Sequence, residues 1–195
     1  MKYEALFSAM NQLVTLSEDD KTKIKAAFQY KQYSKKEVLV QNGEVCNYVR
    51  FILSGYLKKI QLTENGDEKV LLLYAPGFWC AVIESFTERT PSDYVVCTIT
   101  EVEVLQISYE KLQNLYKDCP AVNSFFRRLA EKGLSITHKR IIIDLHSSAK
   151  EKYIAFKKTY PEIDEHIPQY LIASYLGVSK AFFSRLKQQI AKENE

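Results

Sequence analysis

Residues 169–188 read QYLIASYLGVSKAFFSRLKQ, and this stretch decides how the C-terminal part of the chain folds. Small Ala173 suits a point where two helices cross closely, and Gly177, four residues later, permits the positive φ of a tight turn. The hydroxyl of Ser179 can cap a second helix. The apolar contacts that such a helix pair needs are Ile172, Leu176, Val178, Phe183 and Leu186. The pattern predicts a helix-turn-helix motif, and the alternative is a plain helical hairpin.

The second helix of this motif leaves one face free of large apolar residues. Together with the cap, this face holds residue types that reach bases and phosphates: Ser179, Lys180, Ala181, Ser184, Arg185 and Gln188. Residues 179–192 contain four basic and no acidic side chains, whereas a solvated helix face usually carries both signs. Residues 119–195 have a net charge of +5, against −2 for residues 1–118. We therefore predict that the C-terminal part binds double-stranded DNA; a ligand-binding or protein-interaction module that has lost DNA binding is the alternative.

Preceding the motif, the sequence predicts a long helix over residues 120–145, with Pro120 in its first turn. One apolar row of this helix, spaced mainly at intervals of seven, is Val122, Phe125, Leu129, Ile136 and Ile143. This half of a coiled-coil seam predicts a homodimer, whereas a second row is expected to face the chain's own domains. The second row is Phe126, Ala130, Leu134, Ile141 and Leu145. An ordinary core helix without a partner chain is the alternative.

Serine residues mark the starts of other helices. Ser17 precedes three acidic residues, Ser108 precedes a helix that continues through residue 117, and Ser148 forms a capping box with Glu151. A further helix is expected over residues 3–14. After the helix that ends near residue 159, a short polar stretch is expected to lead to residues 167–168.

Between residues 29 and 107 the pattern becomes that of short strands separated by turns. The strand candidates are residues 37–41, 48–53, 56–62, 69–75, 94–99 and 102–107. Four of the six glycines fall here, and Asn65-Gly66 is the strongest hairpin signal in the chain. Regularly punctuated short strands predict an antiparallel sandwich or barrel-like roll.

Composition excludes several classes of protein. The chain has 195 residues, of which 46% are hydrophobic and 26% charged, as is typical of globular proteins. It has no apolar run of the roughly 18 residues that a membrane helix needs and no secretory signal, so we expect a soluble, cytoplasmic protein without membrane contact. The four cysteines and three histidines are scattered, so we expect buried thiols, no metal site and no cofactor. The chain contains no catalytic motif, and Glu84 with Glu88 resembles a polar helix face more than an acid/base pair; we expect no enzyme.

The order of these elements resembles that of the CRP/FNR superfamily of transcription regulators. The resemblance rests on YVRFILSGYLKKI (48–60), TPSDYVVCTITEVEVLQIS (90–108) and IPQYLIASYLGVSKAFFSRLKQ (167–188). It implies an α+β fold with an N-terminal antiparallel, jelly-roll-like β-roll and flanking helices. The implied parts are a cyclic-nucleotide-binding-like sensor domain (1–118), a dimerisation helix and hinge (119–146) and a helix-turn-helix DNA-binding domain (147–195). It also implies a homodimer on a palindromic operator, with RNA polymerase as a candidate partner.

The sequence departs from the family pattern in the sensor domain. Cyclic-nucleotide-binding members carry a Gly-Glu pair for the ribose and an Arg-Ser or Arg-Thr pair for the phosphate, where this chain has Cys80-Ala81 and Pro91-Ser92. These positions therefore lack the carboxylate and guanidinium of such binding, and the cysteine cluster of FNR-like members is also missing. We expect a small-molecule effector of unknown identity, and not cyclic AMP.

An apolar effector pocket is one interpretation of the segment after Phe78, and a filled core is the other. The candidate pocket residues are Trp79, Cys80, Ala81, Val82, Ile83, Phe86, Arg89 and Ser92. Arg89 can serve an anion or lie on the surface. Few residues follow the second helix of the motif, so we expect phosphate contacts from the helices themselves, with help from Lys150, Lys152, Lys157 and Lys158.

Overall fold

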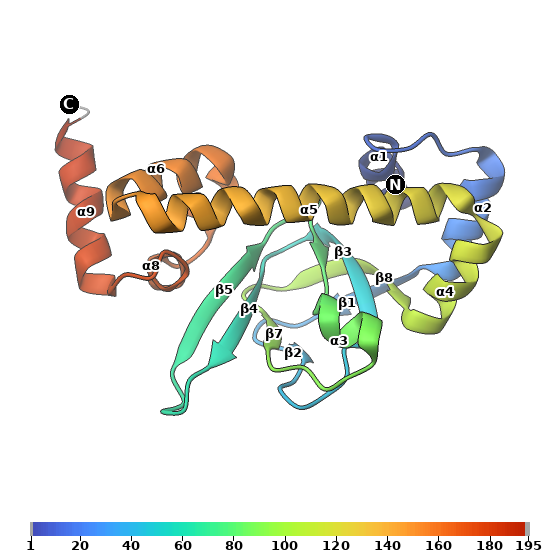
Figure 1. Cartoon of the computed structure of the whole chain (residues 1–195), viewed down its shortest axis with the longest axis horizontal. Helices are drawn as coiled ribbons and strands as arrows, with labels where there is room; N and C mark the ends of the chain where they lie inside the picture. The colour runs from blue at the N-terminus through green and yellow to red at the C-terminus, as the bar shows by residue number, and fades with distance from the viewer. Residues whose placement is uncertain (1, 194–195) are drawn as a thin grey trace.

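A long helix organises the molecule. The computed structural model describes residues 2–193, and its helix α5 (Pro120–His146) runs along most of the length of the molecule, with the strands on one side (Figure 1). Near the N-terminal end of α5 lie α1 (Lys2–Asn11), α2 (Glu18–Ala27) and α4 (Tyr109–Asp118). Around its other end gather α6 (Ala149–Thr159), α7 (Pro161–His166), α8 (Gln169–Tyr175) and α9 (Lys180–Glu193).

The strands form two four-stranded antiparallel sheets, which confirms the predicted β-roll and the α+β class. One sheet has the order β1 (Gln29–Tyr33), β8 (Val102–Ser108), β3 (Tyr48–Ser54), β6 (Trp79–Cys80). The other has the order β2 (Val38–Val40), β7 (Val95–Thr98), β4 (Leu57–Leu62), β5 (Glu68–Tyr74). The short helix α3 (Ile83–Glu88) follows β6.

Two of these strands were not predicted. Strand β1 has the sequence QYKQY and no fully buried residue, because it lies at the edge of its sheet and pairs only with β8. Such a strand lacks the apolar alternation that marks a half-buried strand. Strand β6 has two residues at the opposite edge, too few to give a pattern.

Glycine is required at one turn of the roll. Gly55, between β3 and β4, has φ +82°, and an added Cβ would lie 2.0 Å from the carbonyl oxygen of Glu101. The predicted Asn65-Gly66 hairpin is confirmed between β4 and β5, where the Thr63 N–H donates to the Asp67 carbonyl (3.0 Å).

The predicted serine caps are confirmed. The Ser17 hydroxyl accepts from the Asp20 N–H, the Ser148 hydroxyl from the Glu151 N–H, and each carboxylate accepts in return from the backbone of its serine. Ser108 caps α4. Residues 161–166, expected as a polar stretch, instead form α7, since Pro161 fits a first helical turn and Ile163 is buried beneath it.

The hydrophobic interior forms two clusters. The larger one joins the helices α1, α2, α4 and the start of α5 to the roll. The second contains residues of β4, β5 and β7 together with residues of α6 to α9, so the C-terminal helices pack on the roll. Over the described range 2–193, no helix has the length and apolar content needed to span a membrane.

Candidate nucleic-acid interface and sensor site

Helices α8 and α9 form the helix-turn-helix that the sequence predicts. Ala173 is buried, and its carbonyl accepts from the Val178 N–H (3.0 Å) across the turn. Gly177 has φ +72° in that turn. The Ser179 hydroxyl accepts from the Phe182 N–H (3.2 Å) and so caps α9, as expected. The motif is therefore held by the residue types that its geometry requires.

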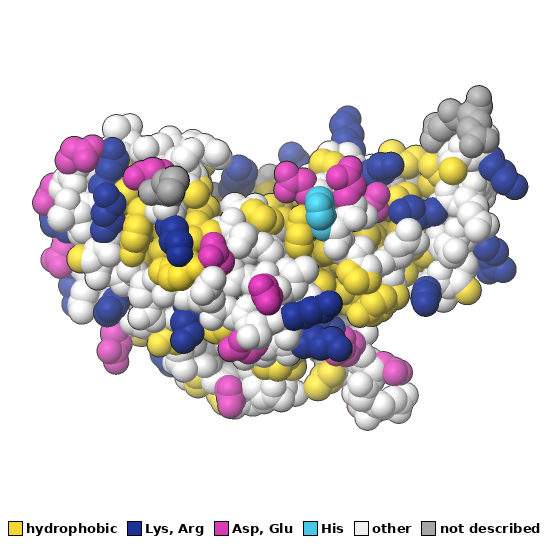
Figure 2. All heavy atoms as spheres, turned by 180° about the vertical axis from the view of Figure 1, so that it is seen from behind, with side chains coloured by type: hydrophobic (Ala, Val, Ile, Leu, Met, Phe, Trp, Pro, Cys, Tyr) yellow, Lys and Arg dark blue, Asp and Glu magenta, His cyan; other side chains and the backbone are white. Residues whose placement is uncertain are grey.

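The outward face of α9 is exposed along its length. Phe183 and Leu186 are buried beneath the helix. The exposed residues on the other side include every member of the predicted contact set: Ser179, Lys180, Ala181, Ser184, Arg185 and Gln188. Lysine and arginine side chains are spread over the outer surface of this end of the molecule (Figure 2). The face offers a guanidinium, an ammonium, a hydroxyl and an amide to an approaching surface.

Several nearby lysines are held by carboxylates of the same chain. Lys187 lies 3.9 Å from Asp164, whose carboxylate also accepts from the Tyr153 hydroxyl at 3.0 Å. Lys150 pairs with a glutamate at the end of α9. Lys152 donates to the carbonyl of Asp144 (2.8 Å) and lies 3.7 Å from its carboxylate. These three lysines therefore fasten helices to one another.

By contrast, Lys157 and Lys158 are exposed on α6, and no ion pair of the described residues includes them. Their charges remain available to a phosphate backbone.

The residues of the predicted effector pocket lie mostly in the packed core. The Trp79 ring contacts those of Phe51, Phe125 and Phe126 with centroid distances of 5.1–5.4 Å. The buried members of the set are Cys80, Ala81, Val82, Phe86 and Ser92. Ile83 is 65% exposed and faces away from them. This arrangement favours the filled core over an apolar chamber.

The polar members of this set have partners within the chain. The Arg89 guanidinium donates to the Cys46 carbonyl (2.9 Å) and the Asn47 side-chain oxygen (2.6 Å), and it lies 4.8 Å from the Tyr109 ring centroid. The Ser92 hydroxyl donates to the Tyr94 carbonyl (2.8 Å). Burial raises the pKa of the Cys80 thiol to about 12, so the thiol stays protonated.

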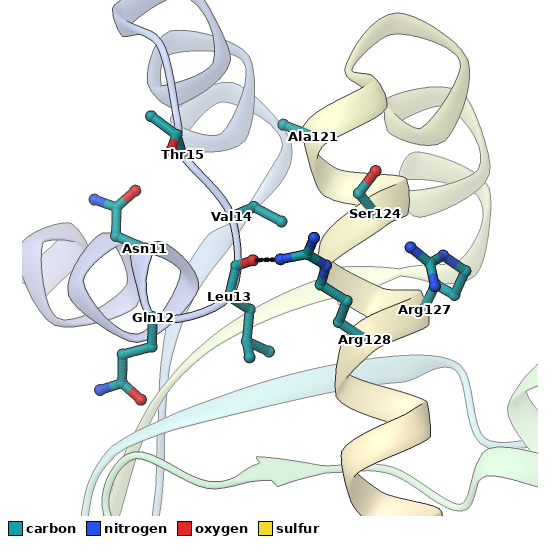
Figure 3. Close-up of a pocket in the computed structure, with 9 residues that line it drawn as sticks. All are labelled: Asn11, Gln12, Leu13, Val14, Thr15, Ala121, Ser124, Arg127 and Arg128. Atoms are coloured by element: carbon teal, nitrogen blue, oxygen red, sulfur yellow. Dashed lines mark hydrogen bonds between the residues drawn. The ribbon is translucent and has the colours of Figure 1, made fainter.

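A polar hollow of about 460 Å³ lies at the surface between the α1–α2 link and the first turns of α5 (Figure 3). Both arginines in its wall are occupied, since Arg128 donates to the Leu13 carbonyl and Arg127 pairs with Glu131 at 2.5 Å. The hollow shares no residue with the predicted effector pocket.

The predicted dimer row needs correction at its N-terminal end. Val122 and Phe125 are completely covered by their own chain, and Leu129 packs against the same core. The prediction that Val122 and Phe125 lie in a dimer seam is therefore wrong. A seven-residue repeat identifies a row of apolar side chains, but it does not say whether the same chain or a second one covers that row. Ile136 is 47% exposed and Ile143 is half-buried.

The row expected to face the chain's own domains is the one exposed in the C-terminal half of α5. Leu134, Ile141 and Leu145 are 59%, 49% and 73% exposed, and Ala130 is exposed as well. From Leu134 through His138 and Ile141 to Leu145 the spacings are four, three and four, as in a coiled-coil seam, and Ala130 lies four residues before Leu134. Only Phe126, near the start of this row, packs on the core as predicted.

The C-terminal helices contact the roll through a set of residues that the sequence did not indicate. The Ser174 hydroxyl on α8 accepts from the Val70 N–H on β5 (3.0 Å). Arg140 on α5 donates to the Leu71 carbonyl (2.7 Å), and its guanidinium lies 4.1 Å from the Tyr175 ring centroid. We call Ser174, Arg140 and Tyr175 with their β5 partners the β5–α8 contact. The sequence does not reveal this contact, because serine, arginine and tyrosine are all common on protein surfaces. Their role becomes visible only when the C-terminal helices are packed on the roll.

Aromatic rings extend this contact on both sides. The rings of Tyr56 and His166 stack with centroids 5.6 Å apart, and those of Phe78 and Tyr160 meet edge to face at 5.9 Å. The C-terminal helices thus pack on the sheet that contains β4 and β5, with α8 in direct contact with β5.

Comparison with known proteins finds similar sequences and similar structures. A family model for the cyclic nucleotide-binding domain matches residues 30–119. The CRP-like protein Clp of Xanthomonas euvesicatoria pv. vesicatoria is 25% identical over 173 residues, covering 80% of this chain and 70% of that protein. The regulatory protein HlyX of Actinobacillus pleuropneumoniae is 22% identical over 143 residues, covering 73% of this chain and 59% of that protein.

Two solved structures share the whole fold. FixK2 from Bradyrhizobium japonicum superposes with a TM-score of 0.72 and 16% identity, covering 86% of each chain. CLP from Xanthomonas campestris, described as a c-di-GMP responsive global regulator, superposes with a TM-score of 0.70 and 18% identity. That match covers 91% of this chain and 93% of CLP. The roll, the long helix and the C-terminal helices therefore recur together.

Proposed function

We propose that this chain is a transcription regulator of the CRP/FNR type and that it binds double-stranded DNA in a sequence-specific manner through α9, which its similarity to such regulators in sequence and fold supports. The exposed face of α9 carries this proposal. It is basic, it projects from a well-packed helix-turn-helix, and within residues 2–193 no ion pair holds its side chains as ion pairs hold Lys150, Lys152 and Lys187.

The side chains of this face suit distinct roles in a major groove. Arg185 is two turns in from the cap, where a guanidinium can pair with guanine O6 and N7. Lys180 and Ser184 can reach phosphates or neighbouring bases, and Gln188 can follow the next step of the groove. Ala181 offers a methyl contact, for instance to thymine.

We propose that the protein acts as a homodimer on a palindromic operator. The seam that supports a parallel helix pair is the exposed row Leu134, His138, Ile141 and Leu145, rather than the row that begins at Val122. Two α9 helices related by a two-fold axis would meet half-sites about 34–36 Å apart. RNA polymerase is a candidate partner of the bound dimer, and the regulator class alone supports this suggestion.

The sensor domain is proposed to respond to a small molecule other than cyclic AMP. The positions of the family's ribose and phosphate contacts hold Ala81 and Pro91, and the side chains around Trp79 fill the core. A ligand-binding or protein-interaction module that does not bind DNA is the second candidate function. Lys180 and Arg185 on α9, which no ion pair among the described residues includes, favour the first.

Selection of bound duplexes from a random pool tests the proposal. The purified protein is incubated with the pool, and the retained duplexes are sequenced after several rounds. We expect a palindrome whose half-sites are about one helical turn apart. The same selection with Arg185→Ala is expected to lose preference at one base pair in each half-site. Retention of unrelated sequences, with no enrichment in any round, would contradict sequence-specific binding, and retention of no duplex above background would support the second candidate.

A further inference from the structure

A buried arginine lies between the two sheets of the roll. Arg50, in the middle of β3, is 3% exposed. It stands opposite Gln106 on β8 and Cys80 on β6, and all three side chains share one face of their sheet. The guanidinium reaches across to the other sheet, where its Nη2 donates to the Leu39 carbonyl next to Val40 (3.2 Å).

The guanidinium has more donors than the chain satisfies. Its Nη1 donates to the Tyr48 carbonyl (3.3 Å), but its Nε, which is buried, has no hydrogen-bond partner. Within residues 2–193, this Nε is the one buried side-chain nitrogen or oxygen without a partner, and no ion pair includes Arg50. The rings of Tyr33 and Tyr48 lie 5.9 and 5.5 Å from the guanidinium carbon, which compensates only part of the charge.

Neighbouring groups do not supply a negative charge. Arginine cannot lose its proton in a protein, so the positive charge persists inside the roll. Burial keeps Cys80 a neutral thiol by raising its pKa, and it likewise raises the pKa of the Tyr74 hydroxyl. The Cys46 thiol donates to the same Tyr48 carbonyl as Arg50 (3.5 Å), and Gln106 accepts from the Tyr33 hydroxyl (2.6 Å). An uncompensated buried ion is strongly unfavourable, and unsatisfied buried donors are rare.

We propose that the Arg50 guanidinium is the centre of a binding site for a small monovalent inorganic anion, of the size of chloride or nitrite, inside the β-roll. The planar fork of Nε–H and Nη–H suits an anion in its plane. Cys46, Cys80 and Gln106 beside it are buried and Tyr33 and Tyr48 are half-buried, a setting that suits a small anion and not a nucleotide. Arg50 lies beside Cys80, one of the positions where nucleotide-binding members contact the ribose, but the proposed anion contacts Nε of Arg50, and its binding does not depend on DNA binding.

An anion bound there would connect the two sheets. Arg50 already links β3 to β2 through the Leu39 carbonyl, and Gln106 and Tyr33 continue the polar layer into β8 and β1. A ligand that binds only the folded chain stabilises it by mass action. At a concentration of 100 times its dissociation constant, the anion would shift the folding equilibrium by on the order of 100-fold.

Thermal unfolding of the full chain tests this site. Sodium gluconate, whose anion is too large for the roll, is replaced stepwise by sodium chloride or sodium nitrite at constant ionic strength. We expect a saturable rise in Tm for the wild type, none for Arg50→Met, and an unchanged rise for Arg127→Met, in which an exposed arginine is removed. No anion dependence in the wild type, or the same dependence in Arg50→Met, would overturn the proposal.

Crystals of the wild-type protein grown in bromide give a second test, which applies even if Arg50→Met does not fold. An anomalous peak in contact with Nε of Arg50 is expected. A water molecule at that position, or no peak there at bromide concentrations that stabilise the protein, would refute the site.

Discussion

The exposed row on α5 gives the sharpest prediction. Leu134 and Ile141 are 59% and 49% exposed. Complete burial of a leucine or isoleucine side chain contributes about 1.5–3 kcal/mol, so covering the exposed half contributes about 0.8–1.5 kcal/mol for each. The double variant Leu134→Glu, Ile141→Glu removes four such side chains from a dimer, which amounts to about 3–6 kcal/mol. The dissociation constant of the dimer is therefore expected to rise by about 100-fold to 10,000-fold.

Sedimentation equilibrium measures this change directly. The wild type is expected at twice the chain mass of 22.6 kDa, and the double variant at the chain mass itself over the same micromolar range. Ile154→Glu is the matched control, because Ile154 is 48% exposed on α6 and outside the seam. A monomeric wild type at high concentration would refute the seam altogether. Dissociation by Ile136→Glu with Ile143→Glu, but not by the Leu134 and Ile141 pair, would restore the row predicted from the heptad spacing.

Three further predictions concern DNA, the β5–α8 contact and the sensor. Arg185→Ala is expected to weaken binding to the selected operator by about 1–3 kcal/mol and to change binding to a scrambled duplex very little. Lys157→Ala is expected to weaken binding to both duplexes slightly and to lower the salt dependence of binding. Fluorescence anisotropy at several salt concentrations measures both effects. Equal losses of Arg185→Ala on both duplexes would assign this residue to phosphate contact. Ser174→Ala leaves the Val70 N–H without its acceptor and is expected to lower the free energy of unfolding by about 1–3 kcal/mol in urea, with Ser184→Ala as the neutral control. Calorimetry is expected to detect no binding of cyclic AMP, and a micromolar dissociation constant would contradict the assignment of Ala81 and Pro91 to the cassette positions.

Local signals in the sequence were sufficient for the local structure. A capping serine, a glycine with positive φ and an apolar row act within a few residues, so Ser148, Gly177 and the contacts of Phe183 could be predicted one by one. The candidate DNA face could be predicted in the same way, because it consists of the residues of α9 that lie opposite its buried side.

Features set by the neighbours of an element could not be predicted in this way. Both rows of α5 are apolar, and only the packing of the folded chain shows that Val122 and Phe125 are covered while Leu134 and Leu145 are exposed. Strand β1 is identified by its pairing with β8 rather than by its side chains. Arg50 belongs to a strand whose other residues are mostly apolar, and the sequence does not show whether its side chain is buried. Its burial becomes evident only when the second sheet packs over it.

The β5–α8 contact gives the roll a direct mechanical route to the proposed DNA-binding face. Strand β5 pairs with β4 along its length, β4 pairs with β7, and β7 pairs with β2, beside the carbonyl that Arg50 contacts. At the other side of β5, Val70 and Leu71 bind Ser174 and Arg140, and the Ser174 helix leads through Gly177 into α9. A shift of the sheet must therefore displace α8 or break the Val70–Ser174 hydrogen bond. Because α5 carries both Arg140 and the exposed seam, the same shift would also alter how two chains meet. A change inside the β-roll can thus reach α9 and the proposed dimer seam through one strand, and neither route requires bound cyclic nucleotide.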